Sequence, residues 1–232
     1  MIVASVLVDF DGTACPVDVF TELCCEFIGD DWEGAFERAN WKGTATLRED
    51  IVRLAALLDA PRAEMLDFVV GHFGLEPGFA SFVEWAEAKG VQVAIVSDGL
   101  GFYIEPLLNA AGIFGLEVIT NALIDAPARS RLSHPFAHPE CVGCGTCKMR
   151  AVLNYREHRG PVAFVGDGSS DRFAALYADV VFAKAELARI CADQGIAFTP
   201  WLEFGDVRAA IEGGRSMKRA PVSAPCPGWT IA

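Results

Sequence analysis

IVASVLVDFDGT, at residues 2–13, is the stretch that decides the fold. Its first seven residues form a nearly continuous apolar run, and an Asp-Phe-Asp-Gly-Thr turn follows directly. Such a run predicts a strand that is buried on both faces, as the strands of a parallel sheet are. The polar residues after it then stand at the carboxyl end of the strand, where open α/β sheets bind their ligands.

Strand-like and helix-like segments alternate through the rest of the chain. Short β-favouring runs recur at residues 91–96, 118–120, 162–165 and 180–183. Segments with helical apolar spacing lie between and beside them at residues 79–89, 103–111, 148–157 and 171–177. This alternation predicts an α/β fold with a doubly wound parallel sheet.

One long stretch breaks the alternation. Residues 15–77 contain no convincing strand, and their apolar residues recur at helical spacing, as at Leu47, Ile51, Leu54, Leu57 and Leu58. We therefore expect a catalytic core at residues 1–14 and 78–212 and a helical cap at residues 15–77, inserted after the first strand. The glycine- and proline-containing end of the chain, residues 213–232, is expected to be an irregular tail.

Composition excludes several classes of protein. The chain has 232 residues, of which 52% are apolar, and this is enough for a buried core. Its net charge of -12 argues against binding to nucleic acid or to an anionic membrane. Neither a membrane-spanning apolar run nor a secretory signal is visible, so we expect a soluble cytoplasmic protein with a small-molecule partner. The sequence specifies no oligomeric state.

Polar residues that suit a single reaction follow the predicted strands. They are Asp9 and Asp11 after the first strand, Ser97, Asp98 and Gly99 after the second, Lys148 at a helix start, and Asp167 and Asp171 after a later strand. The carboxyl ends of parallel strands meet at one edge of the sheet, so these side chains are expected to form one site.

The expected site suits a phosphate ester and a magnesium ion. Asp9, Asp11 and Asp167 would make an oxygen-rich site of the kind that Mg²⁺ prefers. Lys148 adds a positive charge for the phosphate, to which Ser97, Asp98 and Gly99 are also assigned. Asp171 is expected to support Lys148 or a water molecule on the metal.

A carboxylate can attack phosphorus and form an aspartyl phosphate, which water then hydrolyses. We assign the attack to Asp9. Asp11 would protonate the leaving oxygen and later deprotonate the attacking water, a role that contributes roughly 10²–10⁴-fold in rate.

These residues resemble the four sequence motifs of the haloacid dehalogenase (HAD) superfamily. Residues 9–13 are similar to its first motif, Ser97 to its second, Lys148 to its third and residues 166–171 to its fourth. The resemblance implies that Asp9 is the nucleophile and Asp11 the acid/base. It also implies that Asp9, the Asp11 backbone carbonyl and Asp167 hold Mg²⁺. The place of the insertion resembles the helical cap of the phosphoserine-phosphatase-like branch.

Two further resemblances concern the substrate. Residues 141–148, CVGCGTCK, are similar to the cysteine-rich segment of methionine-salvage phosphatases, which act on a phosphorylated methylthio-ketopentenyl enol. Phosphoserine phosphatases carry a glutamate for the substrate amine where this chain has Asp18, and an arginine for its carboxylate where Arg53 lies. Asp18 departs from that pattern, which argues against phosphoserine itself.

Three alternatives remain open. Cys141, Cys144 and Cys147, with His134 or His138, could bind Zn²⁺, or the cysteines could be reduced structural residues. The enzyme could be a phosphotransferase or phosphomutase that uses the same intermediate. A non-catalytic sensor of phosphate ligands is the third alternative, and the full set of carboxylates argues against it.

Overall fold

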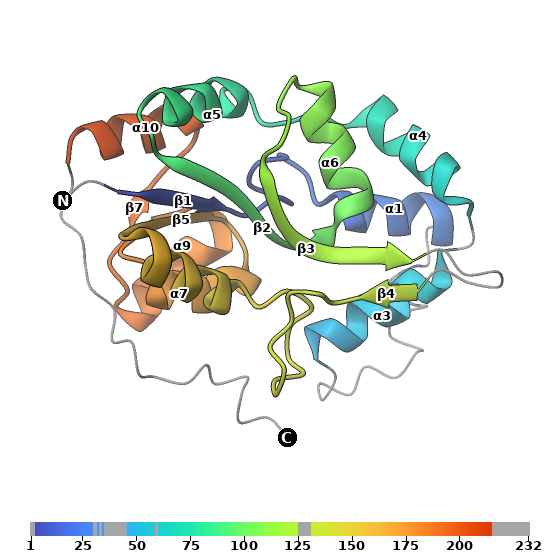
Figure 1. Cartoon of the computed structure of the whole chain (residues 1–232). Helices are drawn as coiled ribbons and strands as arrows, with labels where there is room; N and C mark the ends of the chain where they lie inside the picture. Colours follow the sequence, from blue (N-terminus) through green and yellow to red (C-terminus); the bar gives the residue numbers. More distant parts are fainter. Residues whose placement is uncertain are drawn as a thin grey trace.

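A computed structural model of the chain describes residues 3–29, 32, 34, 46–58, 60–124 and 131–214. In this part of the chain one seven-stranded sheet has the order β4-β3-β2-β1-β5-β6-β7 (Figure 1). Its strands are β1 (Ser5–Val8), β2 (Gln92–Leu100), β3 (Glu117–Ile124), β4 (Arg131–Ser133), β5 (Val162–Gly166), β6 (Val180–Ala183) and β7 (Thr199–Pro200). All the strand pairs are parallel except β3 with β4.

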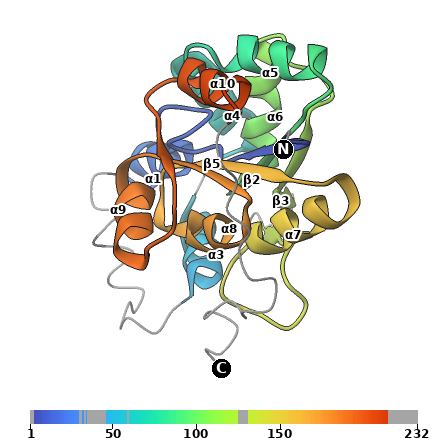
Figure 2. The same ribbon diagram turned by 90° about the vertical axis from the view of Figure 1, so that its left-hand side faces the viewer.

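Helices cover both faces of the sheet. One face carries α5 (Phe79–Ala88), α6 (Gly101–Ala110) and α10 (Phe204–Glu212), and the opposite face carries α7 (Lys148–Arg159), α8 (Arg172–Tyr177) and α9 (Ala185–Gln194) (Figures 1 and 2). A short 3₁₀ turn, η1 (Ser169–Asp171), precedes α8. The predicted doubly wound α/β fold is confirmed.

The alternation of side chains along β1 fills two apolar cores. Val6 and Val8 belong to the core under α5, α6 and α10, whereas Leu7 belongs to the core under α7, α8 and α9. All three side chains are fully buried. Burial of a side chain of this size contributes about 1.5–3 kcal/mol, so the continuous apolar run is a direct consequence of a strand covered on both faces.

The register of β1 with its neighbours determines where the site forms. Val8 lies beside Ile95 of β2 and Val165 of β5, and the Asp9 N–H donates to the Val165 carbonyl at 2.9 Å. The residues that follow Val8, Ile95 and Val165 along the three strands therefore lie at the same edge. The order of the strands reverses on either side of β1, and open α/β sheets bind ligands at such a point.

Between β1 and α5 the described residues form α1 (Val19–Ile28), α3 (Leu47–Leu57) and α4 (Arg62–His72). Asp18 begins α1 by accepting a hydrogen bond from Thr21 N, and Thr46 with Glu49 forms a capping box at the start of α3. The edge-to-face contact of Phe27 with Phe68 joins α1 to α4. The helical character expected for residues 15–77 is present in this part, whereas the boundaries of core and cap stay a prediction.

Several bounds differ from those predicted from the sequence. β2 extends to Leu100 and so contains Ser97, Asp98 and Gly99, which were expected to follow the strand. Of the expected tail, residues 215–232 lie outside the described part. No helix in the part that the structure describes is long and apolar enough to cross a membrane.

Candidate active site

A cavity of about 810 Å³ lies at the carboxyl ends of β1, β2 and β5. Most of the predicted site residues line it, and helices α1 and α3 contribute further walls. The predicted residues on its surface are Asp9, Asp11, Asp18, Ser97, Asp98, Gly99, Lys148 and Asp167.

Asp9 and Lys148 form a buried ion pair at the base of the cavity. Lys148 Nζ lies 2.7 Å from Asp9 Oδ1 and 2.7 Å from Asp171 Oδ1, and their side chains are almost inaccessible to water. Burial alone would lower the pKa of Lys148. The charges of Asp171, Asp9 and Asp98 outweigh that effect and raise the pKa above its usual value, so Lys148 is a fixed cation beside Asp9.

Asp171 holds this arrangement from the side of β5. Its Oδ2 accepts hydrogen bonds from the N–H groups of Asp167 and Gly168, while its Oδ1 pairs with Lys148. Through these three contacts the Asp171 carboxylate fixes both the backbone that follows β5 and the Lys148 ammonium group. The expected supporting role of Asp171 is consistent with these contacts and stays a prediction.

Asp167 directly follows β5 and approaches Asp9, which directly follows the neighbouring strand β1. Its Oδ1 accepts a hydrogen bond from Thr13 Oγ1 at 2.7 Å. Gly12 permits this approach, because it has a φ of +76° and a Cβ there would collide with the Asp167 carboxylate. The turn after β1 therefore accommodates the Asp167 carboxylate at Gly12 and binds it through Thr13.

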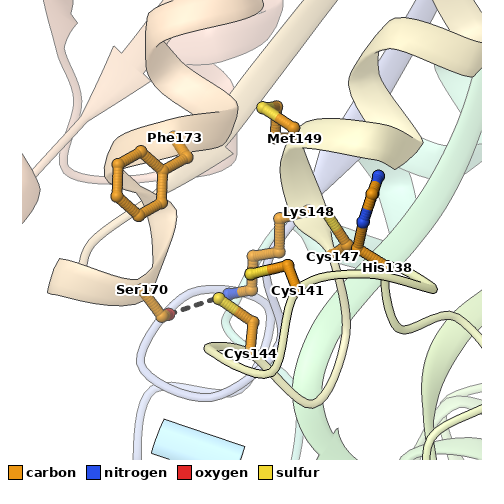
Figure 3. A pocket seen from close by; sticks show the side chains of 8 residues that line it. All are labelled: His138, Cys141, Cys144, Cys147, Lys148, Met149, Ser170 and Phe173. Atoms are coloured by element: carbon orange, nitrogen blue, oxygen red, sulfur yellow. Dashed lines mark hydrogen bonds between the residues drawn. The ribbon is translucent and has the colours of Figure 1, made fainter. Parts of the chain in front are cut away.

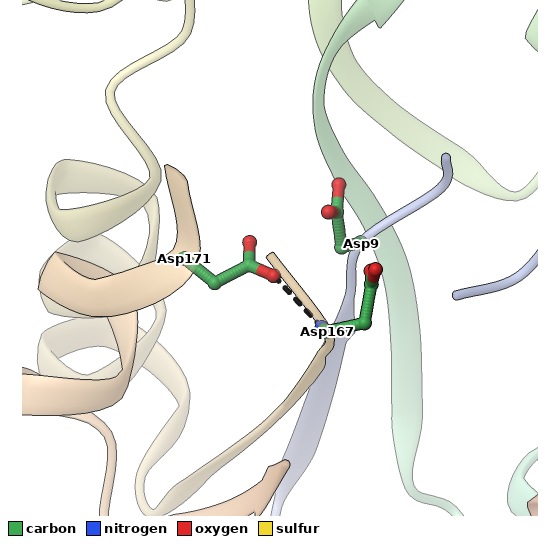
Figure 4. Close-up of side chains that lie close together, drawn as sticks. All are labelled: Asp9, Asp167 and Asp171. Carbon is green, nitrogen blue, oxygen red and sulfur yellow. Dashed lines mark hydrogen bonds between the residues drawn. The ribbon is translucent and has the colours of Figure 1, made fainter. Parts of the chain in front are cut away.

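Asp9, Asp167 and Asp171 each bring one carboxylate oxygen within 4.8 Å of the others (Figure 4). Burial raises the pKa of Asp9 well above its usual value, and the charges of Asp171 and Asp167 raise it further against the opposing effect of Lys148. Burial likewise raises the pKa of Asp167. This crowding of acidic groups fits a divalent cation, which would offset their repulsion.

The side chain of Asp11 points elsewhere. Its Oδ1 accepts a hydrogen bond from Val19 N at 3.0 Å and its Oδ2 accepts one from the Tyr103 hydroxyl at 2.9 Å. Burial raises the pKa of Asp11 to about 7, and the nearby Asp18 charge adds to the effect. The Asp11 carboxylate is thus outside the group of three oxygens, and only its backbone carbonyl is left for the metal contact that the family resemblance implies.

The end of β2 contributes Ser97 and its neighbours through an irregularity in the strand. The register with β3 shifts between Val96 and Leu100, and Ser97 Oγ accepts a hydrogen bond from Gly99 N at 2.9 Å. Asp98 turns to the loop before α7, where its Oδ1 accepts from Thr146 N at 2.8 Å. Burial raises the pKa of Asp98.

Of the two predicted substrate contacts, only Asp18 is among the described residues that line the cavity. Asp18 lines the cavity, where it also begins α1. Arg53 lies on α3, but the described residues that line the cavity do not include it. Its expected contact with a substrate carboxylate is therefore without support from this arrangement.

Several cavity residues were not predicted from the sequence. They are Phe20, Thr46, Leu47, Ile51, Arg172, Phe173 and Glu186. Leu47 and Ile51 are one helical turn apart, so the apolar spacing of α3 was a usable signal for them. Tyr103, which contacts Asp11, was also missed, because no local pattern distinguishes it from a core aromatic residue.

The cysteine-rich loop before Lys148 lines a second, small cavity of about 20 Å³ (Figure 3). His138, Cys141, Cys144 and Cys147 surround it, beside Lys148. Among the described residues, the three carboxylates are the only group of three metal-binding side chains with ligand atoms within 4.8 Å. The zinc alternative stays a prediction, and His134, one of the two histidines considered for it, contacts Asn121 Oδ1 at 2.7 Å.

Relatives of this chain are named as phosphatases. A protein of Brevibacillus brevis, 28% identical over 202 residues, is named 2-hydroxy-3-keto-5-methylthiopentenyl-1-phosphate phosphatase, and the match covers 86% of this chain and 90% of that protein. A protein of Geobacillus kaustophilus with the same name is 29% identical over 208 residues, or 88% and 93% of the two chains.

Solved structures share the fold. A substrate-bound phosphoserine phosphatase superposes with a TM-score of 0.69 at 14% identity and covers 90% of this chain and 98% of its own. A HAD family hydrolase from Salmonella enterica serovar Typhi superposes with a TM-score of 0.72 at 18% identity, covering 93% and 74%.

The family model described as haloacid dehalogenase-like hydrolase matches residues 6–175, which include most of β1, helices α1, α3 and α4, Lys148 and Asp171. The predicted resemblance and the predicted enzyme class, a hydrolase of this type, are confirmed. The chain belongs to the haloacid dehalogenase-like hydrolase family.

Proposed function

We propose that this protein is a Mg²⁺-dependent phosphatase that hydrolyses a small phosphate monoester through an aspartyl phosphate on Asp9. The observation that carries the proposal is the buried pair of Asp9 and Lys148, 2.7 Å apart and open to the large cavity. A carboxylate beside a fixed cation can approach a phosphate dianion without facing uncompensated repulsion.

Asp9 attacks the phosphorus atom in the first step, a P–O bond to Asp9 forms, and the bond to the leaving oxygen breaks. Asp11 gives its proton to that oxygen. In the second step Asp11 takes a proton from water, the water oxygen attacks the phosphorus, and inorganic phosphate leaves as the Asp9 carboxylate returns.

The other residues hold the transferred group. Lys148 contacts a phosphoryl oxygen and neutralises charge on it, and Ser97 donates a hydrogen bond to another. Asp9, the Asp11 backbone carbonyl and Asp167 are the groups that would bind Mg²⁺, which supplies additional positive charge to the phosphoryl oxygens. Thr13 and Asp171 keep Asp167 and Lys148 in place.

The cavity walls support a substrate with an uncharged, largely apolar tail. Phe20, Leu47, Ile51 and Phe173 form apolar parts of the cavity wall, beside charged lining residues such as Arg172 and Glu186. The relatives are named as phosphatases of a methylthiopentenyl phosphate, and the methylthio end of such an ester is apolar, as the first four of these side chains are. We therefore propose an ester of this type, rather than phosphoserine, as the substrate of the present protein.

The test is release of phosphate from a panel of monoesters, with and without Mg²⁺. The panel pairs phosphoserine with esters of similar size that carry apolar tails. Wild type is expected to release phosphate only with the metal and to prefer the apolar tails. Asp9→Asn should abolish release, whereas Asp193→Asn, at an exposed position on α9, should behave as wild type.

Other outcomes would contradict the proposal in different ways. Transfer of phosphate to an added alcohol without release to water would favour a phosphotransferase or phosphomutase. Saturable binding of the esters without turnover would favour a sensor. Efficient hydrolysis of phosphoserine would contradict the apolar-tail proposal alone.

A further inference from the structure

The first turn of α3 is attached to the loop that leads into α7. The Arg48 guanidinium donates from Nε to the Cys144 carbonyl and from Nη2 to the Cys141 carbonyl, both at 2.8 Å. The backbone N–H of Arg48 donates to the Gly143 carbonyl at 3.3 Å. Hydrogen bonds from an ionised donor are stronger than neutral ones, and two from one planar group also fix its orientation.

The same loop leads directly to Lys148. Beyond Cys144, Thr146 N donates to Asp98 Oδ1 at 2.8 Å and Cys147 N donates to the Phe136 carbonyl at 3.0 Å. The first bond attaches the second half of the loop to β2, and the second attaches it to the turn at the start of the same connection. Lys148 follows as the first residue of α7, so the position of its side chain depends on the loop.

Helix α3 also lines the substrate cavity. Leu47 and Ile51 line that cavity, as does Thr46, the N-cap of the helix. Arg48 therefore lies between the apolar wall of the cavity and the loop that carries the phosphate-binding lysine.

We infer that Arg48 is a positioning residue, which couples the α3 wall to the Lys148 loop so that both keep their places around a bound ester. The coupling itself follows from the three hydrogen bonds. Its effect on catalysis rests on the proposed phosphatase function.

A direct contact between Arg48 and a substrate carboxylate fits the structure less well. Arg48 is not among the described residues that line the large cavity. Its Nε and Nη2 donate to backbone carbonyls. Burial lowers the pKa of His134, and the positive charge of Arg48 lowers it further. The guanidinium therefore lies near His134, which is in the segment after β4.

Hydrogen exchange of the whole protein tests the coupling without any substrate. Arg48→Gln is expected to increase amide exchange about tenfold in both α3 and residues 141–147, since it removes two charge-assisted hydrogen bonds. Arg48→Lys keeps the charge but not the planar fork, so its effect should be smaller. Arg208→Gln is the matched control, because Arg208 makes an exposed ion pair with Glu212 on α10. An increase confined to α3, or no increase, would overturn the inference.

Inhibition by orthovanadate tests whether the coupling reaches Lys148. Vanadate mimics only the phosphoryl group, so it has no tail that could touch α3. Arg48→Gln is expected to weaken the inhibition constant by about tenfold, Arg48→Lys by less, and Arg208→Gln not at all. An unchanged constant in Arg48→Gln would overturn the route to Lys148. If wild type hydrolyses no ester, the proposed function fails, and the exchange experiment still decides the coupling.

Discussion

Asp9 and Asp11 lie two positions apart but have opposite surroundings. Asp9 pairs with Lys148, whereas Asp11 accepts hydrogen bonds from two uncharged donors, Val19 N and the Tyr103 hydroxyl. A nearby cation favours the ionised form of a carboxyl group, and burial favours the neutral form. Burial raises the pKa of both carboxyl groups, but of the two only Asp9 has a cation among the described residues at ion-pair distance to oppose that effect, which suits a proposed nucleophile beside a proposed general acid.

The first prediction concerns the basic limb of the pH–rate profile. Burial raises the pKa of Asp11 to about 7, with a further contribution from the Asp18 charge. Asp11 must be protonated to act as the acid, so kcat/KM should fall as pH rises above that range. Asp18→Asn removes the neighbouring charge, lowers the pKa of Asp11, and should move the limb to lower pH.

The measurement is kcat/KM against pH for Asp18→Asn and wild type with the same ester. Asn is as good an N-cap residue as Asp, so α1 should remain intact. Asp193→Asn changes the net charge equally at an exposed position and serves as the control. A limb that stays in place, or moves to higher pH, would refute the proposed influence of Asp18 on Asp11.

Residue positions were predictable where a strand fixes them. Asp9 and Asp167 were predicted near one another because parallel strands end at a common edge, and both line one cavity. Arg53 was assigned by resemblance to the arginine of phosphoserine phosphatases. Such a resemblance does not reveal which side of a helix faces the cavity, and the structure brings Leu47 and Ile51 there instead.

At the scale of elements, the irregular end of β2 is the feature that the sequence did not reveal. Ser97, Asp98 and Gly99 were expected to follow the second strand, because the apolar run that predicts this strand ends at Val96. The chain instead continues as a strand to Leu100, with a shifted register against β3. A shift of this kind reorients side chains beside active sites, and here it brings Ser97 and Gly99 to the cavity.

The second prediction follows from the crowding around Gly99. A Cβ at this position would lie 2.5 Å from Asp11 Oδ2 and closer still to the Tyr103 hydroxyl. Gly99→Ala should therefore displace the Tyr103–Asp11 hydrogen bond and reduce kcat/KM about tenfold or more, with a loss of stability of about 1–3 kcal/mol. Steady-state kinetics and denaturant unfolding measure the two effects.

Gly101→Ala provides the matched control for this steric argument. Its added Cβ would make an ordinary contact of 3.4 Å with Thr120 Cγ2, and alanine is favoured over glycine in a helix. Equal activity in the two variants would show that the site around Asp11 can rearrange, and the steric explanation for Gly99 would then be wrong.

For the molecule as a whole, the alternation of apolar runs was sufficient to predict the doubly wound sheet. The runs at residues 162–165 and 180–183 became β5 and β6 almost without change. The edge strands β4 and β7 were not predicted, because they have three and two residues and carry too little apolar pattern. They form through pairing with a neighbouring strand, and local sequence contains little information about such pairing.

The cluster of Asp9, Asp167 and Asp171 also affects the stability of the whole protein. The pKa of Asp167 is raised by burial and by the Asp171 charge, so the folded state favours the protonated group. At neutral pH, where the group is ionised, this preference reduces the stability of the folded protein. A divalent cation bound by the folded state alone would reverse the effect.

The third prediction is that Mg²⁺ raises the thermal midpoint of wild type and not that of Asp167→Asn. At a concentration about 100 times the dissociation constant, binding adds about 2.7 kcal/mol, or roughly 5–10 °C for a chain of this size. Without metal, Asp167→Asn should unfold at the same temperature as wild type or higher, because it loses the repulsion but can still accept the Thr13 hydrogen bond.

Differential scanning calorimetry with Mg²⁺ and with a chelator distinguishes the alternatives. If Asp167 were only structural, its substitution would lower the midpoint under both conditions and leave the metal-dependent shift intact. If the metal were bound elsewhere, the shift would also persist in Asp167→Asn. A variant that is stable without metal and indifferent to it would identify Asp167 as a residue retained for metal binding at a cost to the stability of the metal-free fold.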